Sequence, residues 1–418
     1  MVSIPLGRSD YFRRVADQAR VRLKNRFFEN NPLSNSQTAI ISRPGIKKFM
    51  DVGNGPIRAL YAEPGAFDDS LFVISSTYLY KVSTAGVSTL CGQLSVVPLG
   101  NPKMVATGFI GTVPEYLFIA EGGVLWCYSD SGFATASLNL SLNVVNNDTV
   151  TIDSIVYKFT SGSVDAGTPA GTLANPWLVK LGAVMSESLT NLYDAINDFG
   201  IPGTGYSTSL TPHASVQAYQ HTTTDLYVRA VVNGAAGNAI TVSETSANAA
   251  WSGATLAGGG APGIIQVPVP DDHGAVSIDY INGYIIVIPV QNAGVNGRFY
   301  WVKPGETTID PLDYATAERS PDAINQVIVF SDKFWLAGNK TTEPWYTTGN
   351  PDEPMNRFSG ILFDRGCWEG TAIQVKESLI LVDPDGGVFQ IGGNLKRIST
   401  PDIEERIRRS IQTQAAEV

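Results

Sequence analysis

The stretch Leu71-Phe-Val-Ile-Ser-Ser-Thr-Tyr-Leu-Tyr80 decides the fold because its pattern recurs along the chain. It joins a short apolar strand, a tight polar turn and a second strand that carries aromatic residues, which predicts a β-hairpin. Similar stretches begin at Tyr116, Tyr284, Phe334 and Leu379, with starts 45–50 residues apart except between the second and third. A unit of about 40–50 residues that supplies strands and no helix is typical of a propeller blade. We therefore expect a mainly β chain that forms a β-propeller of five or more blade-like repeats. Repeated hairpins of a β-sandwich are the alternative, and the long, constant period argues against them.

The wide gap between the second and third repeats predicts an inserted module at about residues 131–265. This segment is rich in Ala, Gly, Ser, Thr and Asn and has three basic residues, Lys158, Lys180 and Arg229. Residues 149–159 alternate as a hairpin, and residues 186–199 carry apolar side chains at helical spacing. We expect an α+β module in a propeller loop, with its helix packed on its hairpin. Its small, flexible flanks predict that residues 135–262 can be replaced by a short linker.

The rest of the chain divides around this module. We expect a basic docking arm at residues 1–50, two propeller parts at 51–130 and 266–400, and a C-terminal helix at 401–418. Thr400 followed by Pro401 is a typical helix start. The five repeats lack an obvious closing strand set, so either residues 39–42 complete a blade or the propeller is open or truncated.

Charge is distributed unevenly along the 418 residues. The net charge is −10, but residues 1–48 carry ten Lys or Arg and three acidic residues, so the remainder carries −17. Aromatic and aliphatic residues are mixed into this arm, which favours docking on an acidic protein surface over simple solvation. The docking candidates are Arg13, Arg14, Arg22, Arg26, Phe27 and Arg43. No apolar run approaches the ~20 residues that span a bilayer, so we expect no membrane insertion.

The sequence offers little for catalysis. Its histidines and cysteines are few and far apart: His213, His221, His273, Cys91, Cys127 and Cys367. No nucleophile elbow, phosphate-binding loop or zinc motif occurs in a suitable context. The run Asp383-Pro-Asp385-Gly-Gly resembles the start of a calcium loop, but the later ligands are missing and a blade turn accounts for it. We expect no enzyme activity, no cofactor and no metal.

Three carboxylates in the segment Ala317–Gly349, Glu318, Asp322 and Glu343, could be read as paired catalytic acids. We expect them instead to be structural, together with Trp345 and Arg357. Buried carboxylates need backbone amides or arginines as partners, and this segment of a blade supplies both.

Two blocks of motifs keep a fixed order along the chain. The first comprises Asn25-Arg-Phe-Phe-Glu-Asn30 and Ile41-Ser-Arg-Pro-Gly45. The second comprises Ala317-Glu-Arg-Ser-Pro-Asp322, Trp335-Leu-Ala-Gly338, Thr342-Glu-Pro-Trp-Tyr-Thr-Thr-Gly349, Pro354-x-x-Arg357-x-x-Gly360, Arg365-Gly366 and Arg397-Ile-Ser399. In order and spacing they resemble the tail nozzle, or packaged-DNA stabilisation, proteins of short-tailed, podovirus-like bacteriophages. The resemblance covers about residues 1–130 and 266–410.

The resemblance implies a structural subunit of a homohexameric tail ring in the virion, assembled in the host cytoplasm. Such a ring extends the DNA channel below the portal and adaptor, retains the packaged genome and passes DNA at ejection. The implied partners are the portal and adaptor of the head-to-tail connector, tail fibres or tailspikes, a tail needle or plug, and double-stranded DNA bound non-specifically in the lumen. An acidic body suits such a conduit because it repels phosphate, although acidity also serves solubility. The alternative is a propeller-based receptor-binding or glycan-degrading tail component, but the repeated Ser-x-Asp-x-Gly-x-Thr-Trp box of sialidase propellers is absent.

Overall fold

The computed structural model describes residues 26–30, 38–42, 48–97, 100–107, 115–270, 274–291, 296–317, 322–351, 353–392 and 394–416. It divides the chain into two units, Met1–Asp51 and Val52–Val418. In the first unit β1 (Arg26–Asn30) pairs antiparallel with β2 (Thr38–Ser42) in a two-stranded sheet. Residues 39–42 therefore pair within this hairpin and are not a strand of any four-stranded sheet.

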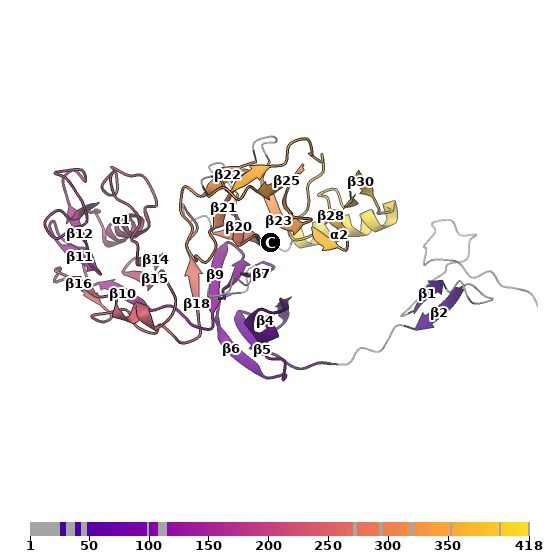
Figure 1. The fold of residues 1–418 in the computed structure, drawn as a ribbon, viewed down its shortest axis with the longest axis horizontal. Coiled ribbons are helices and arrows are strands. Elements are labelled where there is room, and N and C mark those ends of the chain that lie inside the picture. The colour runs from indigo at the N-terminus through magenta and orange to yellow at the C-terminus, as the bar shows by residue number, and fades with distance from the viewer. Residues whose placement is uncertain are drawn as a thin grey trace, which may run out of the picture. The chain divides into compact units, whose positions relative to one another are not determined.

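The second unit contains seven four-stranded sheets, of which five follow one another as antiparallel meanders and form the propeller (Figure 1). We number these five sheets blade 1 to blade 5. Blade 1 comprises β3 (Ile57–Tyr61), β4 (Leu71–Ser75), β5 (Tyr78–Val82) and β6 (Ser88–Gln93). Blade 2 comprises β7 (Lys103–Ala106), β8 (Leu117–Glu121), β9 (Val124–Ser129) and β18 (Gly263–Val267). Blade 3 comprises β19 (Ala275–Ile281), β20 (Tyr284–Pro289), β21 (Arg298–Val302) and β22 (Tyr314–Thr316).

The last two blades repeat the pattern. Blade 4 comprises β23 (Ile324–Phe330), β24 (Lys333–Gly338), β25 (Thr342–Thr347) and β26 (Met355–Arg357). Blade 5 comprises β27 (Ile373–Val375), β28 (Ser378–Val382), β29 (Val388–Gly392) and β30 (Asn394–Arg397). The first strand of each blade contacts the first strand of the next, in the order β3, β7, β19, β23 and β27. This arrangement places the first strands around a common axis, as in a propeller.

Apolar side chains fill each of the four junctions between successive blades. The strand β20 shows why its sequence is a continuous apolar run. Ile285 and Val287 face blade 2, whereas Ile286 and Ile288 face blade 4. Because neighbouring side chains on a strand point to opposite faces, a strand packed on both sides needs apolar residues at every position.

The inner strands of the terminal blades differ from those between them. Leu60 on β3 is 63% exposed and Ile373 on β27 is 54% exposed, whereas β7 and β23 are largely buried. Among the described residues no apolar cluster joins blade 5 to blade 1, and the two stand apart in Figure 1. The described residues therefore form a propeller that is not closed, in agreement with the alternative of an open or truncated propeller.

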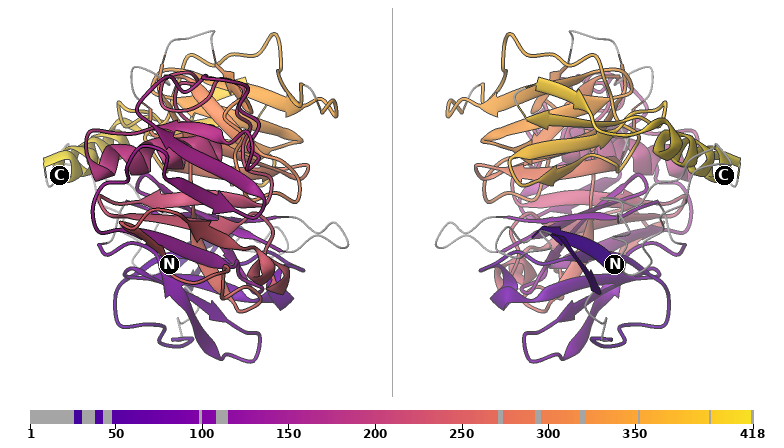
Figure 2. Two further views of the ribbon diagram at one scale, coloured as in Figure 1. Left: turned by 90° about the vertical axis from the view of Figure 1, so that its left-hand side faces the viewer. Right: turned by 90° about the vertical axis from the view of Figure 1, so that its right-hand side faces the viewer.

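The chain leaves blade 2 after β9 and returns as β18, which pairs with β9 as the fourth strand of the same blade. Between them lies the module, with two four-stranded sheets and the helix α1 (Met185–Asn197) (Figure 2). One sheet has β14 (Val216–His221), β15 (Asp225–Ala230), β10 (Thr135–Leu140) and β17 (Ala249–Trp251). The other has β13 (Trp177–Lys180), β12 (Ile155–Thr160), β11 (Thr149–Ile152) and β16 (Val242–Glu244). The fold class predicted from the sequence, a mainly β propeller with an inserted α+β module, is confirmed.

One apolar core fills the module. The helix contributes Leu189, Leu192 and Ile196, and the predicted hairpin contributes Val150 and Tyr157 to the same core. The principal neighbours of α1 are β13, β14 and β15. The helix therefore packs on strands from both sheets, and not on the hairpin alone as the sequence predicted.

Candidate functional site

Several residues singled out in the sequence fall outside the described part of the chain, namely Arg13, Arg14, Arg22, Arg43 and Glu318. Arg26 and Phe27 lie in β1, in the N-terminal hairpin. The docking role of these residues stays a prediction. The remaining candidates, Asp322, Glu343, Trp345 and Arg357, all lie in blade 4.

Asp322 precedes β23 and caps the turn that follows β24. Its carboxylate accepts hydrogen bonds from the backbone amides of Lys340, at 2.7 Å, and Thr341, at 3.0 Å, and from the Thr341 hydroxyl at 3.2 Å. A carboxylate that accepts several donors from one turn fixes the shape of that turn. This arrangement is the one expected of a structural acid.

Glu343 is buried on β25, where its carboxylate accepts a hydrogen bond of 2.8 Å from the indole nitrogen of Trp345. Trp345 packs edge-on against Phe299 of blade 3, with ring centroids 5.0 Å apart. Arg357 lies opposite Trp345 across the β25–β26 pairing. The Glu343–Trp345 pair therefore belongs to the junction of blades 3 and 4.

Two glycines of the predicted motifs touch each other at the junction of blades 4 and 5. A Cβ atom on Gly366 would overlap the carbonyl oxygen of Gly338, and one on Gly338 would lie 2.6 Å from the Asp322 carboxylate. The amide of Cys367 donates to the Gly338 carbonyl at 2.8 Å, and the Thr342 hydroxyl donates to the Arg365 carbonyl at 2.7 Å. Residues of separate motifs, from Asp322 to Gly366, thus meet at one place. The motifs could be identified in the sequence, but the sequence did not indicate that they contact one another at the junction of blades 4 and 5.

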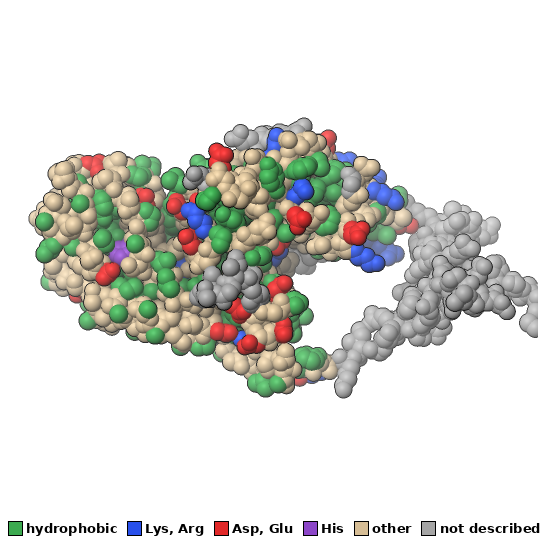
Figure 3. Space-filling view, viewed as in Figure 1, with side chains coloured by type: hydrophobic (Ala, Val, Ile, Leu, Met, Phe, Trp, Pro, Cys, Tyr) green, Lys and Arg blue, Asp and Glu red, His purple; other side chains and the backbone are tan. Residues whose placement is uncertain are grey.

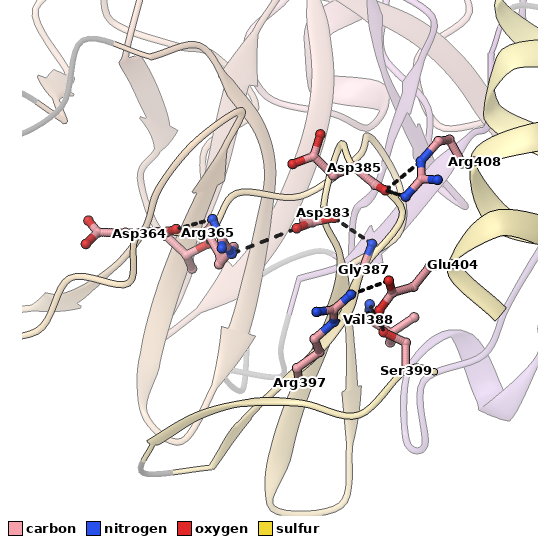
Figure 4. Close-up of polar contacts among 11 residues, drawn as sticks. Asp364, Arg365, Asp383, Asp385, Gly387, Val388, Arg397, Ser399, Glu404 and Arg408 are labelled. Atoms are coloured by element: carbon pink, nitrogen blue, oxygen red, sulfur yellow. Dashed lines mark hydrogen bonds and ion pairs between the residues drawn. The ribbon is translucent and has the colours of Figure 1, made fainter. Parts of the chain in front are cut away.

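A hollow of about 660 Å³ lies beside these glycines and is lined by residues 339–341, 364–366 and 383–385. The guanidinium of Arg365 lies over the ring of Phe389, 5.4 Å from its centroid, and 3.9 Å from Asp383 (Figure 4). Asp383 accepts a hydrogen bond of 2.6 Å from the amide of Gly387. The acidic run is therefore a blade turn, as predicted. No group of three or more His, Cys, Asp or Glu side chains able to hold a metal ion is found in the described part of the chain.

The helix α2 (Pro401–Ala416) begins at the predicted proline and is anchored on blade 5 by Glu404 (Figure 4). The buried carboxylate of Glu404 accepts two hydrogen bonds from the Arg397 guanidinium and one from the Ser399 hydroxyl. These donors, Arg397 first, lower the pKa of Glu404. Arg408, one helical turn beyond Glu404, donates to the Asp385 carbonyl and forms an ion pair with Glu405.

Glu404 explains the Arg397-Ile-Ser399 motif, because both polar residues of that motif bind the same carboxylate. In Figure 3 basic side chains gather over the part of the molecule that carries blade 5 and α2, whereas the module shows almost none on this face. The candidate functional site is therefore a surface, formed by the blade 4–blade 5 junction and the base of α2, with charged groups that suit contact with a protein. No helix among the described residues is long and apolar enough to cross a membrane.

In this propeller the motif residues cap turns, fill blade junctions and anchor a helix. Residues 221–418 match the phage stabilisation family typified by Gp10 of bacteriophage P22, which is described as a β-propeller. The resemblance predicted from the motifs is thereby confirmed for this part of the chain. The matched residues include blades 3 to 5 and α2, together with the last part of the module.

Several solved structures are similar to the chain, but only distantly. The N-terminal part of BBS1, in complex with ARL6, is 8% identical, with 82% of this chain and 67% of that chain covered and a TM-score of 0.31. Hsv2 of Kluyveromyces lactis is 8% identical, with 84% and 76% covered and a TM-score of 0.25. A putative 6-phosphogluconolactonase of Bacteroides uniformis is 10% identical, with 79% and 82% covered and a TM-score of 0.30. No curated protein sequence matches the chain significantly. Similarities this low carry no argument about function.

Proposed function

We propose that the protein is the subunit of a homohexameric tail nozzle ring of a short-tailed phage. In this role the ring extends the DNA channel below the portal and adaptor, retains the packaged genome and passes DNA at ejection. The observation that carries the proposal is the match of residues 221–418 to the phage stabilisation family.

The site of the matched domain supports a structural role. Asp322, Glu343 and Glu404 each accept hydrogen bonds from neighbouring groups of the same domain. A pair of acids that acts on a glycosidic bond needs instead two carboxyl groups that face one open cleft. The geometry of these three acids thus favours a ring subunit over a glycan-degrading tail component.

Charge supports contact with partners through the N-terminal arm. The arm carries a net charge of +7 and the rest of the chain −17. An acidic channel wall lets DNA slide because it forms no phosphate contacts that release counterions. A basic arm with aromatic residues suits the acidic surface of an adaptor above the ring. Tail fibres or tailspikes and a tail needle or plug are the further partners that this role requires.

A retention assay tests the proposal. DNA-filled heads that lack the protein are incubated with purified protein, and the released DNA is measured after nuclease treatment. We expect the protein to form rings on the heads, visible by electron microscopy, and to keep the genome inside. Depolymerisation of host capsule or lipopolysaccharide by the purified protein would contradict the proposal and favour the glycan-degrading alternative.

A charge-reversal variant tests the arm. Replacing Arg13, Arg14 and Arg22 by Glu should abolish attachment to the heads. The matched control replaces Lys158 and Lys180 of the module by Glu, which changes charge away from the arm. Normal attachment of the arm variant would refute the docking role of the arm. The retention assay would still test the proposed ring independently.

A further inference from the structure

A fully buried arginine lies where the module meets blade 3. Arg229 on β15 is 0% exposed. Its guanidinium donates to the hydroxyl of Thr307 at 3.1 Å and to the carbonyl of Thr307 at 2.8 Å. Thr307 belongs to the loop between β21 and β22 of blade 3. A third hydrogen bond, of 2.7 Å, goes to the side-chain oxygen of Gln217 within the module.

Among the described residues the charge of Arg229 has only neutral hydrogen-bond partners. All three of its hydrogen-bond acceptors are amide or hydroxyl oxygens, and its guanidinium lies over the ring of Phe133, 4.7 Å from the centroid. Burial lowers the pKa of Arg229 to about 10, so the side chain is still a cation at neutral pH. A buried cation without a carboxylate is stabilised only while its acceptors and the ring beneath it stay in place.

Further buried polar contacts surround this arginine. The Thr307 hydroxyl donates to the Val231 carbonyl at 3.3 Å. Asn233 joins the module to blade 2, because its amide donates to the Ser129 hydroxyl at 2.8 Å and its carbonyl oxygen accepts from the Tyr116 hydroxyl at 3.2 Å. Directional bonds of this kind specify one orientation of two packed surfaces, which apolar contact alone does not.

We propose that Arg229 fixes the module to blade 3, so that the module and the propeller move as one body. The module is joined to blade 2 by two short segments, residues 130–134 and the glycine-rich residues 257–263. Without further contacts the glycine-rich segment would give the module freedom to move against the propeller. Any partner that contacts the module and blade 3 together then meets a preformed surface and does not have to order it. This inference rests on the geometry of the junction and holds whether or not the protein forms a tail ring.

Chymotrypsin cleavage after Phe133 tests the inference. Phe133 is buried beneath Arg229, so cleavage there requires the junction to open. When opening and closing are fast, the cleavage rate follows the population of the open form. Fragments that begin at Ala134 are quantified by mass spectrometry in wild type, Arg229→Met, Thr307→Val and the double variant. Lys180→Met is the matched control, because the hydrogen bonds that the Lys180 ammonium makes among the described residues go to the Ser161 and Gly162 carbonyls, both within the module.

We expect cleavage after Phe133 to rise at least tenfold in Arg229→Met and at least fivefold in Thr307→Val. The double variant should be cleaved no faster than twice the rate of Arg229→Met, because both changes remove the same contact. Lys180→Met should stay within twofold of wild type. If Arg229→Met fails to fold, Thr307→Val, which removes a single hydroxyl, carries the test. Cleavage rates of both single variants within twofold of the wild-type rate would overturn the inference. A double variant whose rate increase equals the product of the two single increases would also overturn it.

Discussion

An ion pair between blades 1 and 2 allows a stability prediction with a definite magnitude. The guanidinium of Arg58 on β3 contacts the carboxylate of Glu121, which ends β8. Glu121 is 0% exposed and also accepts a hydrogen bond of 3.0 Å from the Ser95 hydroxyl. Arg58 donates further to the carbonyls of Ser76, at 3.0 Å, and Gly100, at 2.8 Å. The pair thus connects blades 1 and 2, and its glutamate side chain is inaccessible to water.

The perturbation is Glu121→Gln, which keeps the size of the side chain and removes its charge. Breaking one partner of a buried ion pair costs about 3–5 kcal/mol, because the remaining charge is left without compensation. Unfolding entropy of ~2.1 cal/mol/K per residue over residues 52–418 amounts to roughly 0.8 kcal/mol/K. A loss of about 4 kcal/mol therefore lowers the Tm by roughly 5 °C.

The assay is thermal unfolding followed by circular dichroism and scanning calorimetry. Glu405→Gln is the matched control, because Glu405 pairs with Arg408 and Arg409 on the exposed face of α2. Exposed pairs are worth about 0–1 kcal/mol, so this control should shift the Tm by roughly 1 °C or less. The variant with Arg58→Met and Glu121→Leu together should recover most of the loss, since both charges are removed. A Tm of Glu121→Gln within 1 °C of wild type would refute the reasoning.

Three further predictions concern the candidate functional site. Gly366→Ala should lower the free energy of unfolding by about 1–3 kcal/mol in urea titrations, because its Cβ would overlap the Gly338 carbonyl; an unchanged midpoint would contradict this. Folding lowers the pKa of Glu404, so this carboxylate stabilises the fold fully at pH values well above its ordinary pKa of 4.5, and its contribution is lost as the pH falls through the lowered pKa. The variant Glu404→Gln should therefore show a smaller fall of Tm between pH 6 and pH 3 than wild type. An equal fall of Tm in both proteins would exclude this carboxylate as the cause. Glu343→Gln should cost about 1–2 kcal/mol, because the bond from the Trp345 indole loses its charged acceptor, and should remove no hydrolytic activity; a glycosidase activity lost in this variant would reverse its structural assignment.

Much of the propeller could be predicted from the sequence because its strands are packed on both faces. The run Tyr284–Pro289 is apolar at successive positions since its side chains alternate between the blade 2 and blade 4 junctions. Such runs, repeated at a constant period, identify blades without knowledge of their neighbours. The helix predicted at residues 186–199 was found at Met185–Asn197 for a similar reason, because its apolar stripe is a local pattern.

The contacts that tie the elements together could not be predicted in this way. Glu404 binds Arg397 and Ser399 at the end of β30 and not Arg408 on its own helix, because a guanidinium with two parallel donors outcompetes a flexible neighbour on an exposed helix. Arg58 and Glu121 are 63 residues apart. No local pattern reveals which distant carboxylate an arginine will meet, since that depends on how two blades are placed.

The module shows most clearly which contacts cannot be predicted from amino-acid composition. Two small, flexible flanks that return to one blade are typical of an exposed insertion, and they led to the prediction that residues 135–262 can be replaced by a linker. The sequence of the flanks, however, indicates only where the chain leaves the propeller and where it returns. It does not indicate which side chains the inserted module buries. Arg229 bonds to Thr307, 78 residues away on blade 3, and Asn233 bonds to Tyr116, 117 residues away on blade 2. A linker in place of the module would remove Arg229 from the ring of Phe133 and leave Thr307 without its partners Arg229 and Val231. We therefore expect the propeller surface beneath the module to behave as part of a core and not as a free face.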